Sequence, residues 1–174
     1  MLLGSKTVLR GVEESDLDNW VKWFNDRQTT EFLARVYPYS RSEAEKYWQK
    51  SQQTNSEILY SILTQEDKQH IGSISLQRID WRSRNAELGV LIGEKEYWSK
   101  GYGQDAVRTL CRFAFDEMGL KRIYLFLHSA NEGGFRAYQK VGFKKEGVAR
   151  QQLYREGSFQ DLILMGLLSD ELLP

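Results

Sequence analysis

Residues 86–118 read AELGVLIGEKEYWSKGYGQDAVRTLCRFAFDEM, and three successive elements can be distinguished in them. The first seven residues form a β-rich run of strand length. The stretch YWSKGYG, at residues 97–103, then brings two glycines together. From Val107 to Met118 apolar residues recur at helical spacing, and we expect Gly119 to end that helix. The stretch predicts a strand, a glycine loop and a long helix.

The sequence on either side of this stretch extends the pattern. Capping-box spacing in Ser40-Arg41-Ser42-Glu43 predicts the start of a helix, and Ser15-Asp16 resembles another helix start. β-rich runs predict strands at residues 7–10, 58–63, 71–76, 86–92, 123–127, 147–154 and 162–168. Residues 132–140 predict a short helix that Gly142 stops. The last two strands form a hairpin that turns at Glu156-Gly157. The order βααβββαβαββ predicts an α/β (α+β) fold with a mixed sheet flanked by helices.

Composition limits the class of protein. A chain of 174 residues predicts one domain, residues 1–174. The 24 basic and 24 acidic residues cancel, so no global field favours nucleic acid or an anionic membrane. No apolar run has the length of a membrane span and no targeting segment is recognisable, which predicts a cytoplasmic protein. Cys111 is the single cysteine and His70 and His128 are the two histidines, so no metal is expected.

The glycine loop at residues 97–103 carries the first chemical signal. Glycines permit a close approach of the backbone, and the free N–H groups of a helix N-terminus favour a phosphate or pyrophosphate. Lys100 adds a positive charge at the rim. The same two glycines can equally do no more than turn the chain into the helix.

Two other phosphate-binding patterns fit this loop poorly. Gly101-x-Gly103-x-x-Ala106 matches the dinucleotide fingerprint, but the loop does not follow its strand directly. The next expected strand, residues 122–128, also lacks the acid that would bind a ribose. The P-loop pattern of nucleotide hydrolases is absent from the sequence.

Three motifs occur in order: the β-rich run at residues 86–92, the loop at residues 98–103, and Asn131-x-x-x-x-x-x-Tyr138-x-x-x-Gly142-Phe143. Together they resemble the GNAT superfamily of acyl-CoA N-acyltransferases. The loop is similar to the Gln/Arg-x-x-Gly-x-Gly/Ala pyrophosphate signature, with Trp98 in place of Gln or Arg. Weaker likenesses near both ends, including Gly157-x-Phe159-x-Asp161, resemble the branch of ribosomal-protein N-terminal and spermidine acetyltransferases.

The resemblance implies a site for acetyl-CoA as cosubstrate. The backbone of residues 90–92 would line the pantetheine arm, and one of its N–H groups would face the thioester oxygen. The residues expected to bind the cosubstrate are Val90, Leu91, Ile92, Trp98, Ser99, Lys100, Gly101, Tyr102, Gly103, Gln104, Asn131, Phe135 and Tyr138. Members of this family often form dimers, so the resemblance also implies a homodimer.

Acetyl transfer to an amine needs an unprotonated nucleophile and a proton for the departing thiolate. Glu87 is the candidate general base or substrate anchor, although an ordinary ion-paired strand glutamate would look the same in a sequence. The family motif makes Tyr138 the candidate general acid; its alternative is an aromatic packed beside Phe135. Asn131 also fits a helix cap. Cys111 lies on the apolar stripe of the long helix, which favours direct transfer over an acyl-enzyme.

The acceptor is left open by the sequence. A protein N-terminus, a small-molecule amine such as spermidine or spermine, and an amino sugar are all compatible with it. A CoA-binding sensor without turnover is the non-catalytic alternative, whereas scattered basic residues argue against nucleic acid. Aromatic residues of the N-terminal region are candidates for the acceptor pocket: Trp20, Trp23, Phe32, Tyr37 and Tyr39. Acids that would attract a polyamine are Glu13, Glu14, Asp16, Asp18 and Glu31.

Overall fold

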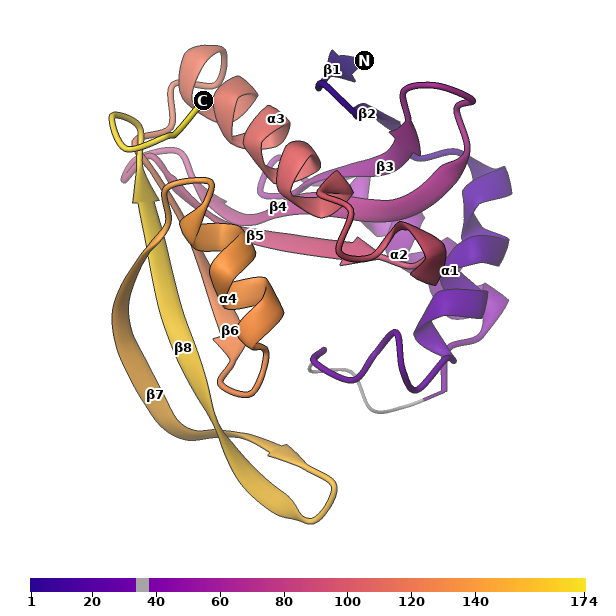
Figure 1. The fold of residues 1–174 in the computed structure, drawn as a ribbon. Helices are drawn as coiled ribbons and strands as arrows, with labels where there is room; N and C mark the ends of the chain where they lie inside the picture. Colours follow the sequence, from indigo (N-terminus) through magenta and orange to yellow (C-terminus); the bar gives the residue numbers. More distant parts are fainter. Residues whose placement is uncertain (34–37) are drawn as a thin grey trace.

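The computed structural model describes residues 1–33 and 38–174, and it contains one eight-stranded sheet with helices packed against it (Figure 1). The strands are β1 (Leu2–Leu3), β2 (Thr7–Gly11), β3 (Ile58–Thr64), β4 (His70–Asp80), β5 (Asn85–Ile92), β6 (Arg122–His128), β7 (Lys144–Arg155) and β8 (Ser158–Leu168). The helices are η1 (Glu14–Asp16), α1 (Leu17–Phe24), α2 (Arg41–Ser51), η2 (Lys95–Tyr97), α3 (Tyr102–Asp116) and α4 (Glu132–Gln139).

The strands lie in the order β1-β2-β3-β4-β5-β6-β8-β7. Neighbouring strands run antiparallel except β5 and β6, which are parallel. A parallel pair needs a crossover connection, and α3 supplies it. The predicted mixed, mostly antiparallel sheet and the predicted order of its elements are therefore confirmed. The two-residue strand β1 at the sheet edge is an addition that the sequence pattern did not indicate.

The main core lies between the sheet and α3. Every other residue of β5 from Ala86 to Ile92 packs into it, together with Leu110 and Cys111 of α3. Cys111 is fully buried, and burial raises the pKa of its thiol, as expected for a packed small side chain. Gly119 ends the segment after α3 with a φ of 68°, which L side chains rarely adopt.

A second cluster holds α1 and α2 against the opposite face of the sheet. Trp20 and Trp23 of α1 are each 1% exposed and pack with Ala44 of α2. Leu59 of β3 and Leu91 of β5 join this cluster from the sheet. The predicted capping box begins α2: Ser40 accepts from the Glu43 N–H and the Glu43 side chain accepts from the Ser40 N–H. The two faces of β5 therefore belong to two different clusters.

β7 and β8 form a long hairpin that projects from the rest of the sheet (Figure 1). Its turn lies at Glu156 and Gly157, as predicted, with φ values of 49° and 80°. Two irregularities in register interrupt the pairing of β7 with β8. In the part of the chain that the structure describes, no helix is both long enough and apolar enough to cross a membrane.

Candidate active site

The sheet splits between β5 and β6. The two strands pair only at Asn85↔Arg122, Ala86↔Ile123 and Glu87↔Tyr124. Beyond this base, β5 stays paired with β4 as far as Ile92, whereas β6 stays paired with β8 as far as His128. Figure 1 shows the two strands diverging from their common base. The edges that face each other across the split are therefore free of strand partners, and polar backbone groups there need a ligand or water.

The predicted glycine loop lies at the end of β5 and leads into α3. Ser99 and Gly101 have φ values of 58° and 87°, so the backbone turns through left-handed conformations. A Cβ on Gly103 would lie 3.3 Å from Ile92 Cγ1, which shows how closely the helix start approaches the strand. The Trp98 indole N–H donates to Ile92 O at 2.7 Å. Trp98 therefore ties the loop to the strand with its side chain.

A run of free backbone donors follows. Within the described residues, the N–H groups of residues 99–104 donate to no protein acceptor, and Gly101 is a helix N-cap without a side-chain hydrogen bond. The first intrahelical bond runs from Asp105 N–H to Gly101 O at 2.9 Å. Free N–H groups at the positive end of a helix dipole form an anion site. The residues present therefore fit a pyrophosphate.

Glu87 lies at the base of the split, on the face of β5 opposite the α3 core. Its carboxylate forms an ion pair with Arg78 at 2.5 Å, and its side chain is 21% exposed while that of Arg78 is 72% exposed. Gln77 of β4 and Tyr124 of β6 are its register partners. The glutamate is thus both accessible and ion-paired, so the ordinary ion-pair interpretation and a role in chemistry remain compatible.

α4 places two further candidates. Asn131 caps this helix by accepting from Gly134 N–H at 2.9 Å. The Tyr138 ring packs edge-on against Phe143 at 5.6 Å between centroids. Burial, with a smaller contribution from neighbouring Cys111, raises the pKa of Tyr138 to about 12. Because of this raised pKa, the Tyr138 phenol is protonated at neutral pH. Its hydroxyl forms no hydrogen bond with any described residue and is therefore available as a donor.

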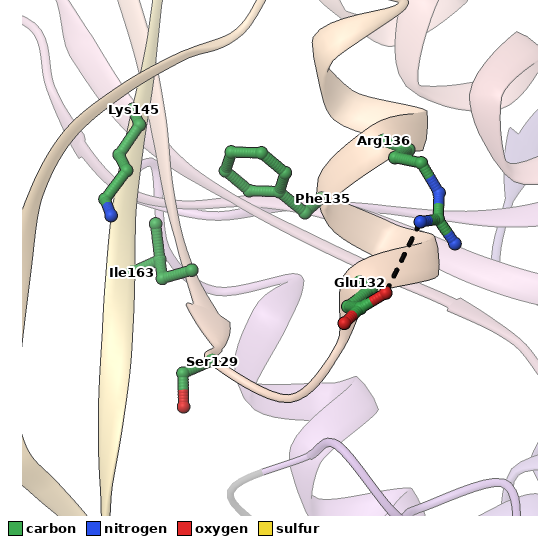
Figure 2. Close-up of a pocket in the computed structure, with 6 residues that line it drawn as sticks. All are labelled: Ser129, Glu132, Phe135, Arg136, Lys145 and Ile163. Carbon is green, nitrogen blue, oxygen red and sulfur yellow. Dashed lines mark hydrogen bonds and ion pairs between the residues drawn. The ribbon is translucent and has the colours of Figure 1, made fainter.

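Phe135 lines a pocket beside the β7–β8 hairpin. A pocket of about 330 Å³ lies between α4 and the β7–β8 hairpin, and it is lined by Ser129, Glu132, Phe135, Arg136, Lys145 and Ile163 (Figure 2). In Figure 2 the Phe135 ring points from α4 toward the strand that carries Ile163. Of the residues expected to bind the cosubstrate, this pocket contains Phe135 alone.

Most aromatic candidates for the acceptor pocket are core residues. Trp20, Trp23 and Tyr39 are buried in the α1–α2 cluster, because α1 and α2 pack through their aromatic faces. Phe32 is 36% exposed and contacts the His128 ring, with centroids 5.6 Å apart. Tyr37 lies outside the described residues. Phe32 is therefore the described member of this set that reaches the end of β6.

The acids proposed to attract a polyamine are largely neutralised within the chain. Arg10 binds the Asp16 carboxylate at 2.8 and 2.9 Å and lies 3.7 Å from Glu13. Arg41 forms ion pairs with Asp18 and Glu14. Glu31 is exposed and has no ion pair among the described residues. Four of the five acids thus serve the fold of the N-terminal region.

Several residues near the site gave no signal in the sequence. Lys6 donates from Nζ to Lys100 O at 2.9 Å, although the two residues are far apart in the chain. Glu94 accepts from Lys22 at 2.6 Å and from the Trp23 indole at 2.9 Å. Lys95 binds Asp26 at 2.7 Å. These contacts connect the loop after β5 to the β1–β2 turn, to α1 and to the residues after α1, and only the folded topology reveals them.

The chain is similar to known acetyltransferases. The model of the acetyltransferase (GNAT) domain family matches residues 6–144. The spermidine N(1)-acetyltransferase of Vibrio cholerae serotype O1 is 25% identical over 171 residues, which cover 98% of each chain. The putative ribosomal N-acetyltransferase YdaF of Bacillus subtilis is 38% identical over 100 residues, covering 58% of this chain and 54% of that protein.

Solved structures agree with this similarity. The crystal structure of spermidine N-acetyltransferase from Vibrio cholerae, in complex with CoA and spermine, superposes with a TM-score of 0.89 at 26% identity. The match covers 96% of this chain and 98% of that one. The fold and the split sheet therefore define an acyltransferase that uses a CoA thioester. The chain belongs to the GNAT acetyltransferase family, and it is an acetyl-CoA-dependent N-acetyltransferase.

Proposed function

We propose that residues 1–174 form one catalytic domain that transfers the acetyl group of acetyl-CoA directly to a primary amine, in a ternary complex. The observation that carries this proposal is the run of free N–H groups at residues 99–104, which follow the end of β5 that is no longer paired with β6. The acetyl thioester is the chemistry that the cosubstrate supplies when bound. Direct transfer is supported by Cys111, whose burial and raised pKa leave no thiolate to carry an acyl group.

The N–H groups of Ser99 to Gln104 would hold the pyrophosphate, with Lys100 at the rim. The free edge of β5 at Val90, Leu91 and Ile92 would line the pantetheine arm and offer an N–H to the oxyanion. Asn131 would contact the cosubstrate from the start of α4. The Phe135 ring lines the pocket beside β8, so it would assist cosubstrate binding indirectly, by packing α4 in place.

Glu87 and Tyr138 are the proposed catalytic pair. Glu87 would accept the proton of the incoming ammonium, directly or through water, or would anchor that ammonium. Tyr138 would protonate the departing thiolate, and its raised pKa keeps the phenol protonated over the pH range in which amines react. No step requires a metal. Among the described residues, no three His, Cys, Asp or Glu side chains are grouped to bind one.

The acceptor that we propose is a small-molecule primary amine or a peptide N-terminus. A polyamine is the second candidate, because a spermidine acetyltransferase matches nearly the whole chain in sequence and in structure. The N-terminal acids add little support for it, since Arg10 and Arg41 already bind most of them. An amino sugar is the remaining acceptor class.

We also propose a cytoplasmic homodimer. Exposed apolar side chains on β7 and β8 support an interface on the projecting hairpin, namely Val148, Tyr154 and Phe159. Sedimentation of the purified chain across a concentration series tests this, and a mass of 20.3 kDa at every concentration would contradict it.

Release of CoA thiol from acetyl-CoA tests the proposed function. Spermidine, aminoglycosides, amino sugars, amino acids and short peptides with free N-termini form the panel, with a control that lacks amine. We expect release above the control with one class of amine, which identifies the acceptor. Saturable CoA binding without release for every amine would instead favour the sensor.

A further inference from the structure

The ammonium of Lys6 lies against the junction between the glycine loop and α3. Its Nζ donates to Lys100 O at 2.9 Å and lies 5.6 Å from the centroid of the Tyr102 ring. A Cβ built on Gly101 would be 3.7 Å from the same nitrogen. One cation from the β1–β2 turn therefore contacts Lys100 and Tyr102, on either side of Gly101 in the proposed pyrophosphate site.

A single carboxylate fixes the position of Lys6. Asp105, in the first turn of α3, accepts from the backbone N–H groups of Ser5, Lys6 and Thr7 at 2.9–3.0 Å. It also accepts from the hydroxyls of Ser5 and Thr7 at 2.6 and 2.7 Å. Burial alone would raise the pKa of Asp105, but these hydrogen bonds outweigh it and hold the pKa below its usual value. The β1–β2 turn is thus attached to the helix that follows the loop.

The hydrogen bond from Lys6 also determines how the loop presents a donor. In a planar trans peptide, the C=O of one residue and the N–H of the next point in opposite directions. Because Lys100 O points toward Lys6, the Gly101 N–H points to the opposite side of the loop. That N–H is one of the six free donors at residues 99–104.

We propose that Lys6 is a positioning residue for the pyrophosphate-binding loop: its ammonium holds the Lys100–Gly101 peptide with the Gly101 N–H exposed on the far side of the loop, and adds positive charge across the loop from the bound anion. Asp105 acts through Lys6 by fixing the turn that carries it. This inference rests on the proposed cosubstrate site. It assigns to that site a residue that lies outside both the glycine loop and the split strands.

Calorimetry with CoA tests the role of Lys6. We expect Lys6→Met to raise the Kd for CoA roughly tenfold, as for the loss of a charged hydrogen-bonding group, and Lys6→Arg to restore most of the affinity. The matched control is Lys46→Met, which removes the same charge from an exposed position on α2. This control is expected to leave the Kd unchanged. The difference between Lys6→Met and the wild type should shrink as salt increases.

A ligand without phosphate separates positioning of the loop from general damage. Ligand-observed NMR gives the Kd for pantetheine, and we expect Lys6→Met to leave it unchanged. Equal loss of affinity for pantetheine and CoA, or a CoA Kd within twofold of the wild type, would overturn the proposal. A wild-type chain that binds no CoA would instead overturn the cosubstrate site itself.

A double-mutant cycle tests the dependence on Asp105. Asp105→Asn is expected to raise the Kd for CoA and to lower the melting temperature, whereas Lys6→Met should leave the melting temperature nearly unchanged. If Asp105 acts through Lys6, the double variant binds CoA about as weakly as the weaker single variant. Full additivity of the two effects on the Kd would show that Asp105 acts independently.

Discussion

On the α3 side of the split between β5 and β6, the groups free to bind a ligand are backbone N–H groups; on the side of Glu87 they are side chains. The first set is positioned by chain path, through the glycine loop and the start of α3. The second depends on which side chains β4, β5 and β6 bring together, and on Arg78 beside Glu87. A backbone site tolerates changes of side chain, whereas a side-chain site changes with each substitution. We call the N–H groups of residues 99–104 the backbone half of the site, and Glu87 and Tyr138 with their neighbours the side-chain half. Enzymes that share the backbone half can therefore differ in the side-chain half.

The largest effect is expected from a side chain without a backbone substitute. Tyr138→Phe should lower kcat by about 10²–10⁴-fold, the usual contribution of a general acid, and leave the Kd for CoA unchanged. Folding should be little affected, since the hydroxyl has no hydrogen bond among the described residues. Thiol release and calorimetry measure the two quantities, with the exposed Tyr154→Phe as the control. A variant that works at the wild-type rate would remove Tyr138 from the chemistry.

Glu87→Gln is the next test of the side-chain half. We expect kcat/KM for the amine to fall by about 10²-fold, within the range for a general base. If Glu87 is the base, the loss should diminish at high pH, where more of the amine is already unprotonated. A loss that is equal at every pH and confined to KM would indicate an anchor. Arg78→Met is the control, because it removes the ion-pair partner and keeps the carboxylate.

Asp16→Asn tests how much the buried Asp16 carboxylate contributes to the stability of the fold. Burial would raise the pKa of Asp16, but hydrogen bonds from Arg10, the Glu13 backbone and Ser61 lower it to about 2. Because this pKa is below its unfolded value of about 3.9, the stabilisation is present above pH 4 and lost as the pH falls toward 2. We expect Asn to reduce the free energy of unfolding by about 2 kcal/mol at pH 7.

Urea unfolding at pH 7 and at pH 3 measures this difference. Asp18→Asn, which alters an exposed acid of α1, should change stability far less. A stability of Asp16→Asn equal to the wild type at pH 7 would contradict the assigned role.

The smallest effect concerns the backbone half. Gly101→Ala places a side chain on a residue with a φ of 87°, at a cost of about 1–2 kcal/mol if the conformation is kept. We expect the Kd for CoA to rise about fivefold and kcat to change little. Gly133→Ala in α4, where a Cβ meets no atom within 4 Å, is the control. An unchanged Kd for Gly101→Ala would show that the left-handed conformation is dispensable.

The backbone half could be predicted from the sequence because its signals are local. A β-rich run, two glycines and a helical stripe predicted β5, the loop and α3, and the capping box at Ser40 predicted the start of α2. The side-chain half could not be, since contacts such as Arg78 with Glu87 depend on strand register and a local irregularity in β4. The burial of Trp20 and Trp23 could not be predicted for a different reason: whether an aromatic stripe on a helix lines a pocket or packs in the core depends on what lies against it, here α2 and the sheet.

The limited pairing of β5 with β6 also has a consequence for hydrogen exchange. Three residue pairs join the two strands, and beyond them each strand has one neighbour instead of two. Amides along this seam are protected by a single ladder, so local opening there needs less free energy than opening of the continuous sheet between β3 and β4. A ligand bound in the split contacts both strands in place of the missing strand pairing. Its binding raises the free energy needed for local opening, so the two parts of the sheet unfold more cooperatively when it is bound.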